Sequence, residues 1–192
     1  MEIRLPRPHL PQNLPRKKVL IPVIIAIVII VGIVVWLNWP YKEYKNAKMS
    51  PTSDVYQNIK REPTDSLFAN TLDLLGYDKF LQDNGPFTVF APIDSSYNNM
   101  PASTRDFFAE KDNRGSLHQM ILYHIVKGKY TFADLKDGMR LKTLEGETLT
   151  ISKKGNYLSL DGHSYIKIKD LVSSNGVVHL VTDFLIPKTM LN

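Results

Sequence analysis

The histidines and carboxylic acids of this sequence are the side chains best suited to chemistry, but their spacing predicts no reaction centre. One histidine stands in the N-terminal tail, and the others are scattered along the chain without the spacing of metal ligands: His9, His118, His124, His163 and His179. His179 and Asp183 would share one face of a strand. They would lie about 13 Å apart along it, which is too far for a hydrogen-bonded pair.

Other catalytic patterns are missing from the sequence as well. There is no Gly-x-Ser-x-Gly turn, no phosphate-binding loop and no dinucleotide-binding fingerprint. The chain has no cysteine, which excludes disulfides, thiolate metal sites and a cysteine nucleophile. We therefore expect that the protein is not an enzyme and binds no cofactor and no metal. An enzyme or a small-ligand-binding domain is a distant alternative.

The net charge of +5 at pH 7 is unevenly distributed. Residues 1–18 carry a net charge of +4, residues 38–62 carry +2 and residues 63–192 carry −1. A nucleic-acid-binding protein would carry its excess positive charge on the folded domain, so we expect no nucleic-acid partner. Positive charge that flanks an apolar run instead indicates membrane orientation and contact with anionic headgroups.

An uncharged apolar run from Val19 to Leu37 predicts a transmembrane helix. Such a helix would span roughly 28 Å, close to the hydrocarbon thickness of a bilayer. Trp36, Trp39 and Tyr41 cluster at its far end, as side chains at a membrane interface do. A cleaved signal peptide would have a shorter apolar region that ends in small residues. We therefore expect an uncleaved signal-anchor helix over residues 19–38, with the lipid bilayer as a partner.

The distribution of basic residues predicts the orientation of this helix. Arg16, Lys17 and Lys18 directly precede the run, whereas the lysines that follow it are more widely spaced. The positive-inside rule then places residues 1–18, a basic and proline-rich tail, in the cytoplasm, and the rest of the chain in the periplasm or outside the cell. The sequence has no Asn-x-Ser/Thr sequon, which favours a bacterial inner membrane over a glycosylating pathway.

Beyond the span, polar residues 39–62 are predicted to be a linker, and helices follow first. Asp65 is expected to cap a helix that ends at Gly76. Ser103 with Asp106, and Ser116 with Gln119, have the pattern of capping boxes. The helix that starts at Ser116 would carry one apolar face: Leu117, Met120, Ile121, His124 and Ile125.

Strands are predicted mainly in the second half of the chain, where the hydrophobic period changes to two. The last of them would be apolar on nearly both faces and therefore central in the sheet. Helices followed by strands predict an α+β fold with an antiparallel sheet. The expected strands are 87–91, 140–144, 148–152, 157–160, 166–169 and 177–186.

Four segments in this order resemble the motifs of the fasciclin (FAS1) domain family. Phe87-Thr88-Val89-Phe90-Ala91-Pro92 is similar to the first motif and Tyr123-His124 to the central Tyr-His pair. Residues 141–146 resemble the hairpin element, and residues 168–187 the second motif. The resemblance covers residues 63–188 and implies a single wedge or sandwich of strands with helices packed on one side. It also implies adhesion and protein–protein contact, without catalysis. Residues 189–192 would be a short tail.

The resemblance also suggests which residues bind a partner and which serve the fold. Tyr123, His124 and Asp170 are candidates for partner binding. For His124 the other interpretation is a hydrogen-bonded histidine in the core. For Asp170 it is an acid that caps backbone N–H groups near a turn. The remaining motif residues, for which we expect structural roles, are Phe87, Pro92, Asn175, Gly176 and His179. For the Asn-Gly pair we expect a turn with positive φ.

Two functional hypotheses follow from these patterns, and the first is favoured over the second. The first is an accessory or structural subunit of a larger membrane complex of the respiratory or photosynthetic type, in which the domain caps the outer face. The second is a cell-surface or envelope adhesion or matrix-binding protein that binds partners through the domain. In both, the partners are other integral membrane or envelope proteins. An accessory subunit would be held through its helix and tail, whereas an adhesion protein would bind through the domain alone.

Overall fold

The computed structural model describes residues 49–155 and 157–190. The predicted cytoplasmic tail, the predicted membrane span and the interfacial residues Trp36, Trp39 and Tyr41 lie outside the described residues. Within the described part of the chain, no helix combines the length and the apolar character needed to cross a bilayer.

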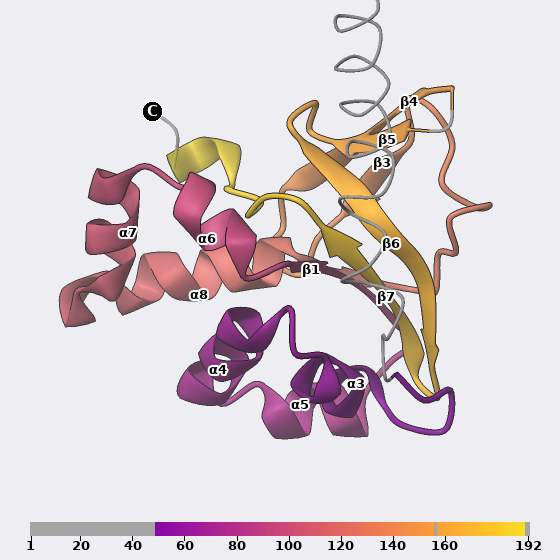
Figure 1. Cartoon of the computed structure of the whole chain (residues 1–192), viewed down its shortest axis with the longest axis horizontal. Coiled ribbons are helices and arrows are strands. Elements are labelled where there is room, and N and C mark those ends of the chain that lie inside the picture. Colours follow the sequence, from indigo (N-terminus) through magenta and orange to yellow (C-terminus); the bar gives the residue numbers. More distant parts are fainter. Residues whose placement is uncertain (1–48, 156, 191–192) are drawn as a thin grey trace, which may run out of the picture. The chain divides into compact units, whose positions relative to one another are not determined.

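The described residues form an α+β domain around one seven-stranded sheet (Figure 1). The strand order is β2-β1-β7-β6-β5-β4-β3. The strands are β1 (Phe87–Pro92), β2 (Ile125–Lys127), β3 (Arg140–Lys142), β4 (Thr148–Lys154), β5 (Tyr157–Leu160), β6 (Ser164–Ser173) and β7 (Gly176–Val181).

Strands β1 and β7, which are neighbours in the interior of the sheet, run parallel, and this corrects part of the prediction of an antiparallel sheet. The other pairings of the named strands are antiparallel, as predicted. All six residues of β1 and all six of β7 are buried. Strands covered on both faces suit parallel pairing, and the long stretch of chain between β1 and β7 allows the crossover that such pairing needs. The prediction that the last strand is central and buried is confirmed, but the strand ends at Val181 and not at Ile186.

The sheet curls so that its two edge strands approach each other. A bridge between Val126 of β2 and Thr143, just after β3, joins the two edges. The N–H of Leu144 also donates to the C=O of Ile125 at 2.8 Å. This closure encloses a core of large buried side chains from most strands, including Phe90, Val126, Leu141, Leu149, Ile151, Leu158, Leu160 and Val181.

The helices lie to one side of this sheet (Figure 1). They are α3 (Val55–Arg61), α4 (Ser66–Leu75), α5 (Asp78–Asp83), α6 (Ser95–Asn99), α7 (Ala102–Ala109) and α8 (Arg114–Tyr123), with short 3-10 turns at Lys111–Asn113 and Lys188–Met190. The second 3-10 turn occupies part of the predicted C-terminal tail. It is held because the N–H of Thr189 donates to the carboxylate of Glu147 at 3.1 Å.

The domain begins before residue 63, which corrects the predicted extent of the linker. Helix α3 lies within residues 39–62 and packs against α4 and α5. Its Val55 and Ile59 are fully buried, and Asn58 donates from Nδ2 to Ser173 Oγ at 2.7 Å. Asp54 caps this helix by accepting the N–H of Gln57. A helix that buries two aliphatic side chains belongs to the folded domain.

The predicted helix caps are wrong, although the predicted helices exist. Asp65 precedes α4, but its side chain makes no capping bond, and Asp94 accepts the N–H of Leu67 at 2.9 Å in its place. Helices α7 and α8 begin before Ser103 and Ser116, so neither serine is an N-cap. An acid from a distant loop can replace a local cap, which the local sequence does not reveal.

Candidate partner-binding site

Three adjacent cavities lie along helices α6, α7 and α8 and the segment that follows β7, and we call them together the helical groove. The first, of about 370 Å³, and the second, of about 750 Å³, share Ile186. The third, of about 190 Å³, shares Met100 and Phe184 with the first and Phe108 with the second. The shared side chains are all apolar, so a continuous apolar stripe links the cavities.

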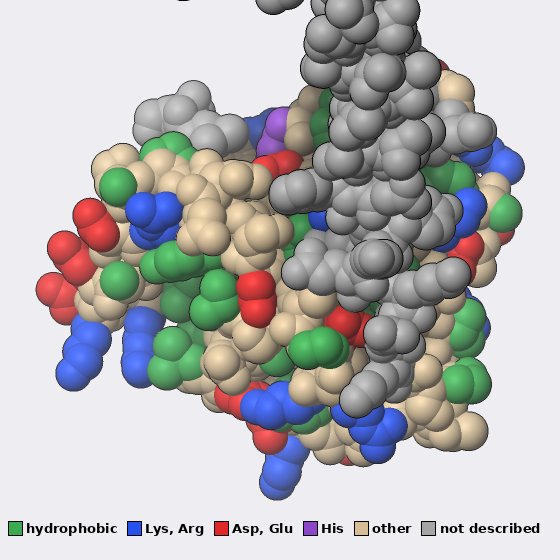
Figure 2. Space-filling view, in the orientation of Figure 1, with side chains coloured by type: hydrophobic (Ala, Val, Ile, Leu, Met, Phe, Trp, Pro, Cys, Tyr) green, Lys and Arg blue, Asp and Glu red, His purple; other side chains and the backbone are tan. Residues whose placement is uncertain are grey.

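Helix α7 borders the groove without burying any of its own residues. Phe107 is 44% exposed, and its ring meets that of Phe108 edge to face, with 5.3 Å between the ring centroids. Tyr97 and Leu74 are also exposed at 40% and 55%. Figure 2 shows hydrophobic side chains gathered on this face where the helices meet. Exposed apolar side chains in such a cluster are typical of an interaction surface.

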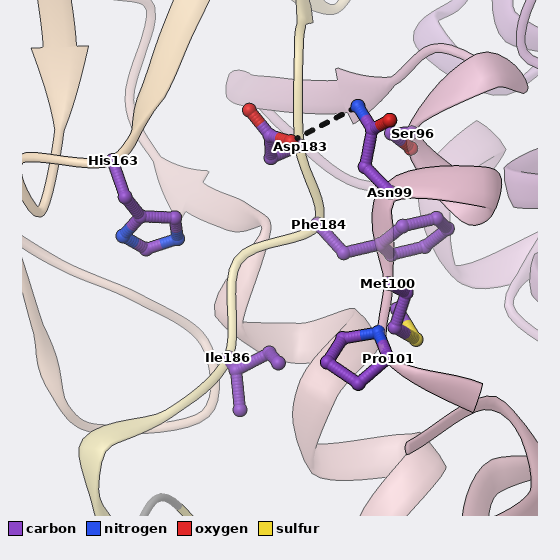
Figure 3. Close-up of a pocket in the computed structure, with 8 residues that line it drawn as sticks. All are labelled: Ser96, Asn99, Met100, Pro101, His163, Asp183, Phe184 and Ile186. Atoms are coloured by element: carbon purple, nitrogen blue, oxygen red, sulfur yellow. Dashed lines mark hydrogen bonds between the residues drawn. The ribbon is translucent and has the colours of Figure 1, made fainter. Parts of the chain in front are cut away.

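The first cavity has a polar end, and His163 lines the cavity on another side (Figure 3). Asn99 Nδ2 lies 3.5 Å from Asp183 Oδ1, and Ser96 lines the same end. Met100 and Phe184 form apolar walls. Among the described residues, no three His, Asp or Glu side chains come together as metal ligands. The cavity therefore offers one carboxylate, one amide, one hydroxyl and one imidazole beside apolar walls.

His124 is fully buried and connects helix α8 to the segment after β7, both of which border the groove. Its Nδ1 bonds the C=O of Met120 at 2.8 Å, and its Nε2 accepts the N–H of Leu185 at 2.9 Å. These partners define the neutral tautomer with the proton on Nδ1. Burial lowers the pKa of His124 to about 4. Its ring also meets that of Phe184 edge to face, so it serves the fold and positions the groove.

Tyr123 is also fully buried. Its hydroxyl donates to Asp161 Oδ2 at 2.5 Å, and burial is the main reason why its pKa is raised. Asp161 is fixed in turn, because Oδ1 accepts the N–H of Thr150. The Tyr-His pair therefore lies inside the domain, out of reach of a partner in this conformation.

Asp170 and His179 act together to hold one loop. Asp170 Oδ1 accepts the N–H of Phe132 at 2.7 Å, and the N–H of Asp170 donates to His179 Nδ1 at 3.2 Å. His179 Nε2 bonds the C=O of Tyr130 at 2.9 Å. Asp170 lies at an irregularity of β6 with φ of 59°. This geometry favours the interpretation of Asp170 as an acid that caps backbone N–H groups.

Asn175 and Gly176 have structural roles, but not through positive φ. Asn175 Nδ2 donates to the C=O of Leu81 and Asn84, and Oδ1 accepts the N–H of Val55, so one side chain joins three segments. Gly176 is needed because a Cβ there would stand 2.1 Å from the carbonyl oxygen of Phe87. Close contact between strands, and not turn geometry, therefore requires the glycine.

Comparison with known proteins identifies the domain. The model of the fasciclin domain family matches residues 64–187, which is more than half of the chain. This chain belongs to the fasciclin domain family. Phe87 and Pro92, the first and last residues of the first fasciclin motif, bound the buried strand β1.

Relatives of this fasciclin domain occur in animals and bacteria. The chain is 29% identical over 136 residues to pig transforming growth factor-beta-induced protein ig-h3, covering 71% of this chain and 20% of that protein. It is 34% identical over 107 residues to protein sll1483 of Synechocystis sp., covering 56% of this chain and 58% of that protein. The chain thus spans less than two thirds of either relative.

A solved structure has the same fold. The FAS1 domain pair from the insect cell adhesion molecule Fasciclin I matches with a TM-score of 0.62 and 16% sequence identity. The match covers 71% of this chain and 52% of that chain. At this level of identity the likeness supports the fold alone.

Sequence reasoning missed the groove of this fasciclin domain. Asn99 and Phe184 are not among the predicted site residues, and Asp183 is considered only as a partner of His179. Residues 182–186 are predicted to continue the last strand. The polar pair Thr182-Asp183, after four apolar residues in the five positions 177–181, is the signal that the strand ends there. The sequence predicts that Phe107 lies on a helix but not that its side chain is exposed, because the exposure depends on how α7 packs.

Proposed function

We propose that this chain is a non-catalytic protein-binding module of the adhesion type, held outside the cytoplasm by the predicted span at residues 19–38. Membership of the fasciclin family supports a binding role, and a solved protein of the same fold is described as a cell adhesion molecule. The observation that carries the proposal is the helical groove, with its exposed Phe107 and the apolar stripe from Met100 to Ile186.

The chemistry of the groove suits a protein partner better than a reaction. Its walls combine aromatic and aliphatic side chains with a few polar groups at the edges, as interface cores do. Phe107 and Tyr97 are rigid side chains that a partner could cover at low entropic cost. The buried motif residues behind the groove, such as His124, keep this surface in one shape.

Site-specific photo-crosslinking in living cells tests the proposal. A photoreactive phenylalanine analogue at Phe107 is expected to capture a discrete partner protein. The same analogue at Tyr157, which is 64% exposed on β5 away from the groove, serves as the matched control and is expected to capture none. Cells that display the chain are expected to adhere, and Phe107→Glu is expected to abolish adhesion. Equal capture at both positions would argue against the groove as the interface.

The accessory-subunit hypothesis predicts a different dependence on the membrane segment. A chimera in which an unrelated single-pass anchor replaces residues 1–38 keeps the whole fasciclin domain. If the chain is an adhesion module, the chimera retains the partner captured at Phe107. If the chain is a subunit held through its helix and tail, the partner is lost. The comparison of the full chain with the chimera therefore separates the two roles.

A further inference from the structure

We propose that the cavity between α6 and residues 182–186 binds a basic side chain, that of a lysine or arginine, which the partner protein inserts. The inference rests on the proposed function and specifies its chemistry. The cavity has a volume of about 370 Å³, which is at the lower end of the range for ligand pockets and large enough for a side chain.

The carboxylate of Asp183 supplies the charge for such a ligand. Oδ2 accepts the hydroxyl of Thr182 at 2.6 Å, whereas the one hydrogen bond of Oδ1 within the described part of the chain is the long contact of 3.5 Å with Asn99. Within residues 49–155 and 157–190, no lysine or arginine forms an ion pair with this acid. A carboxylate can accept about four hydrogen bonds, so Oδ1 can still accept an ammonium or guanidinium donor.

The backbone of Asp183 is held in place before any ligand binds. Its N–H donates to Ser164 Oγ at 3.1 Å, and its C=O accepts the same hydroxyl at 3.0 Å. Ser164 is fully buried in β6, so the segment is anchored to the sheet. A carboxylate on a fixed backbone loses little conformational entropy on binding, which favours affinity.

Ser96 provides a second, independent sign of a missing ligand. Ser96 is only 2% exposed and its hydroxyl has no hydrogen-bond partner among the described residues, although it lines the same end of the cavity as Asp183 (Figure 3). Buried polar groups in proteins almost always have a partner, and an unpaired one is costly. A donor that enters beside Asp183 would give this hydroxyl its partner.

The apolar walls indicate a basic side chain and not a metal ion or a small anion. Met100, Pro101, Phe184 and Ile186 form the apolar walls of the cavity, and His163 lines it as well (Figure 3). Lysine and arginine carry their charge at the end of a long aliphatic stem, which matches an apolar channel that leads to one carboxylate. A metal ion would need further ligands, and no group of three comes together in the described part of the chain.

The neighbouring cations of the domain are engaged elsewhere. The guanidinium of Arg105 donates to the C=O of Met100 at 3.1 Å and lies over the ring of Tyr97. Lys188 pairs with Asp161 at 3.5 Å. Neither of these two side chains pairs with Asp183. His163 also lines the cavity, but its Nδ1 lies 3.4 Å from the C=O of Asp161. A basic side chain of the partner would therefore supply a charge that these residues do not.

The test measures binding of two probes to the full chain in nanodiscs by NMR of the methyl groups of Met100 and Ile186. The probes are N-acetyl-lysine methylamide and the neutral, nearly isosteric N-acetyl-norleucine methylamide. We expect the lysine probe to bind at least about tenfold more tightly. Asp183→Asn is expected to remove that difference, and Ser96→Ala to weaken the lysine probe while the domain stays folded. Asp106→Asn, the same charge change on α7 outside this cavity, is expected to have no effect.

Each result supports or overturns the inference. Equal binding of the two probes, unchanged binding in Asp183→Asn, or no perturbation of the cavity methyl groups would overturn it. The crosslink at Phe107 is read separately. If it persists while the lysine probe fails, the protein-binding function stands and the basic ligand falls. If the lysine probe binds and no partner crosslinks at Phe107, the cavity's preference for a basic ligand stands and the protein-binding function falls.

Discussion

The imidazole of His124 accepts the backbone N–H of Leu185 at 2.9 Å, across 61 residues of sequence. The same ring bonds the C=O of Met120 in α8 through Nδ1. Leu185 lies between Phe184 and Ile186, two side chains that line the helical groove. One buried histidine therefore sets the position of the groove wall relative to the helix that faces it.

Replacement of His124 by alanine is expected to destabilise the domain by about 4 kcal/mol. The loss combines a cavity in the core with a buried N–H of Leu185 that has no acceptor. Denaturant unfolding of the full chain in detergent, followed by circular dichroism, measures the change. Gln119→Ala on helix α8, which His124 follows, is the control, with a change within about 0.5 kcal/mol because Gln119 is exposed. A similar loss in both variants would contradict the role assigned to His124.

The stabilising effect of His124 is expected to depend on pH. Burial lowers its pKa from 6.5 to about 4, so the unfolded chain binds a proton that the folded chain rejects between these values. The contribution of His124 is complete above pH 6.5 and is lost as the pH falls towards 4, by up to about 3 kcal/mol. Unfolding curves at both ends of this window should show a smaller gap between wild type and His124→Ala at the acidic end. A constant gap would refute the assignment.

The sequence was most informative where burial and periodicity act locally. The α+β class, the buried strand from Val177 onward, the helix that ends at Gly76 and the four family motifs were all predicted. Gly76 adopts φ of 74°, as a glycine at the end of a helix should. These features depend on hydrophobic pattern and backbone freedom, which are visible within a few residues.

Features that depend on distant contacts were beyond such reasoning. The cap of α4 comes from Asp94, and the end of α8 is set by His124, whose bond to Leu185 depends on the closed sheet. Ile125 was expected on the helix but begins β2, since it pairs with Val89 of β1. The candidate groove depends on how α6 and α7 pack, which periodicity does not encode.

Asp65 is expected to make stability fall as the pH rises. The side chain is fully buried and both carboxylate oxygens lack a hydrogen-bond partner in the described structure. Burial, and then the charges of Glu62 and Asp94, raise its pKa from 3.8 to about 9. The folded chain thus retains a proton that the unfolded chain releases above pH 3.8. The stability that depends on this proton is complete below pH 3.8 and is lost as the pH rises through about 9.

Asp65→Asn isolates this effect because the amide is neutral throughout that range. The slope of unfolding free energy against pH is expected to differ between wild type and variant by up to about 1.4 kcal/mol per pH unit. Unfolding measured at several pH values gives both slopes. Asp83→Asn, which changes an exposed acid, is expected to leave the wild-type slope unchanged. Parallel slopes for wild type and Asp65→Asn would show that Asp65 is not protonated in the folded chain.

Gly176→Ala is expected to disrupt the pairing of strands β1 and β7. A Cβ at Gly176 would stand 2.1 Å from the carbonyl oxygen of Phe87, which belongs to the backbone of β1 and cannot swing aside. The strands must separate, so we expect the free energy of unfolding to fall by about 4 kcal/mol or more, or a chain that does not fold.

Gly115→Ala in α8 is the matched control. Its Cβ would meet no atom within 4 Å, and alanine favours the helix by about 0.5–1 kcal/mol, so this variant is expected to be more stable. Thermal unfolding measures the stability of both variants. An unchanged unfolding temperature for Gly176→Ala would show that β1 and β7 are not packed this closely.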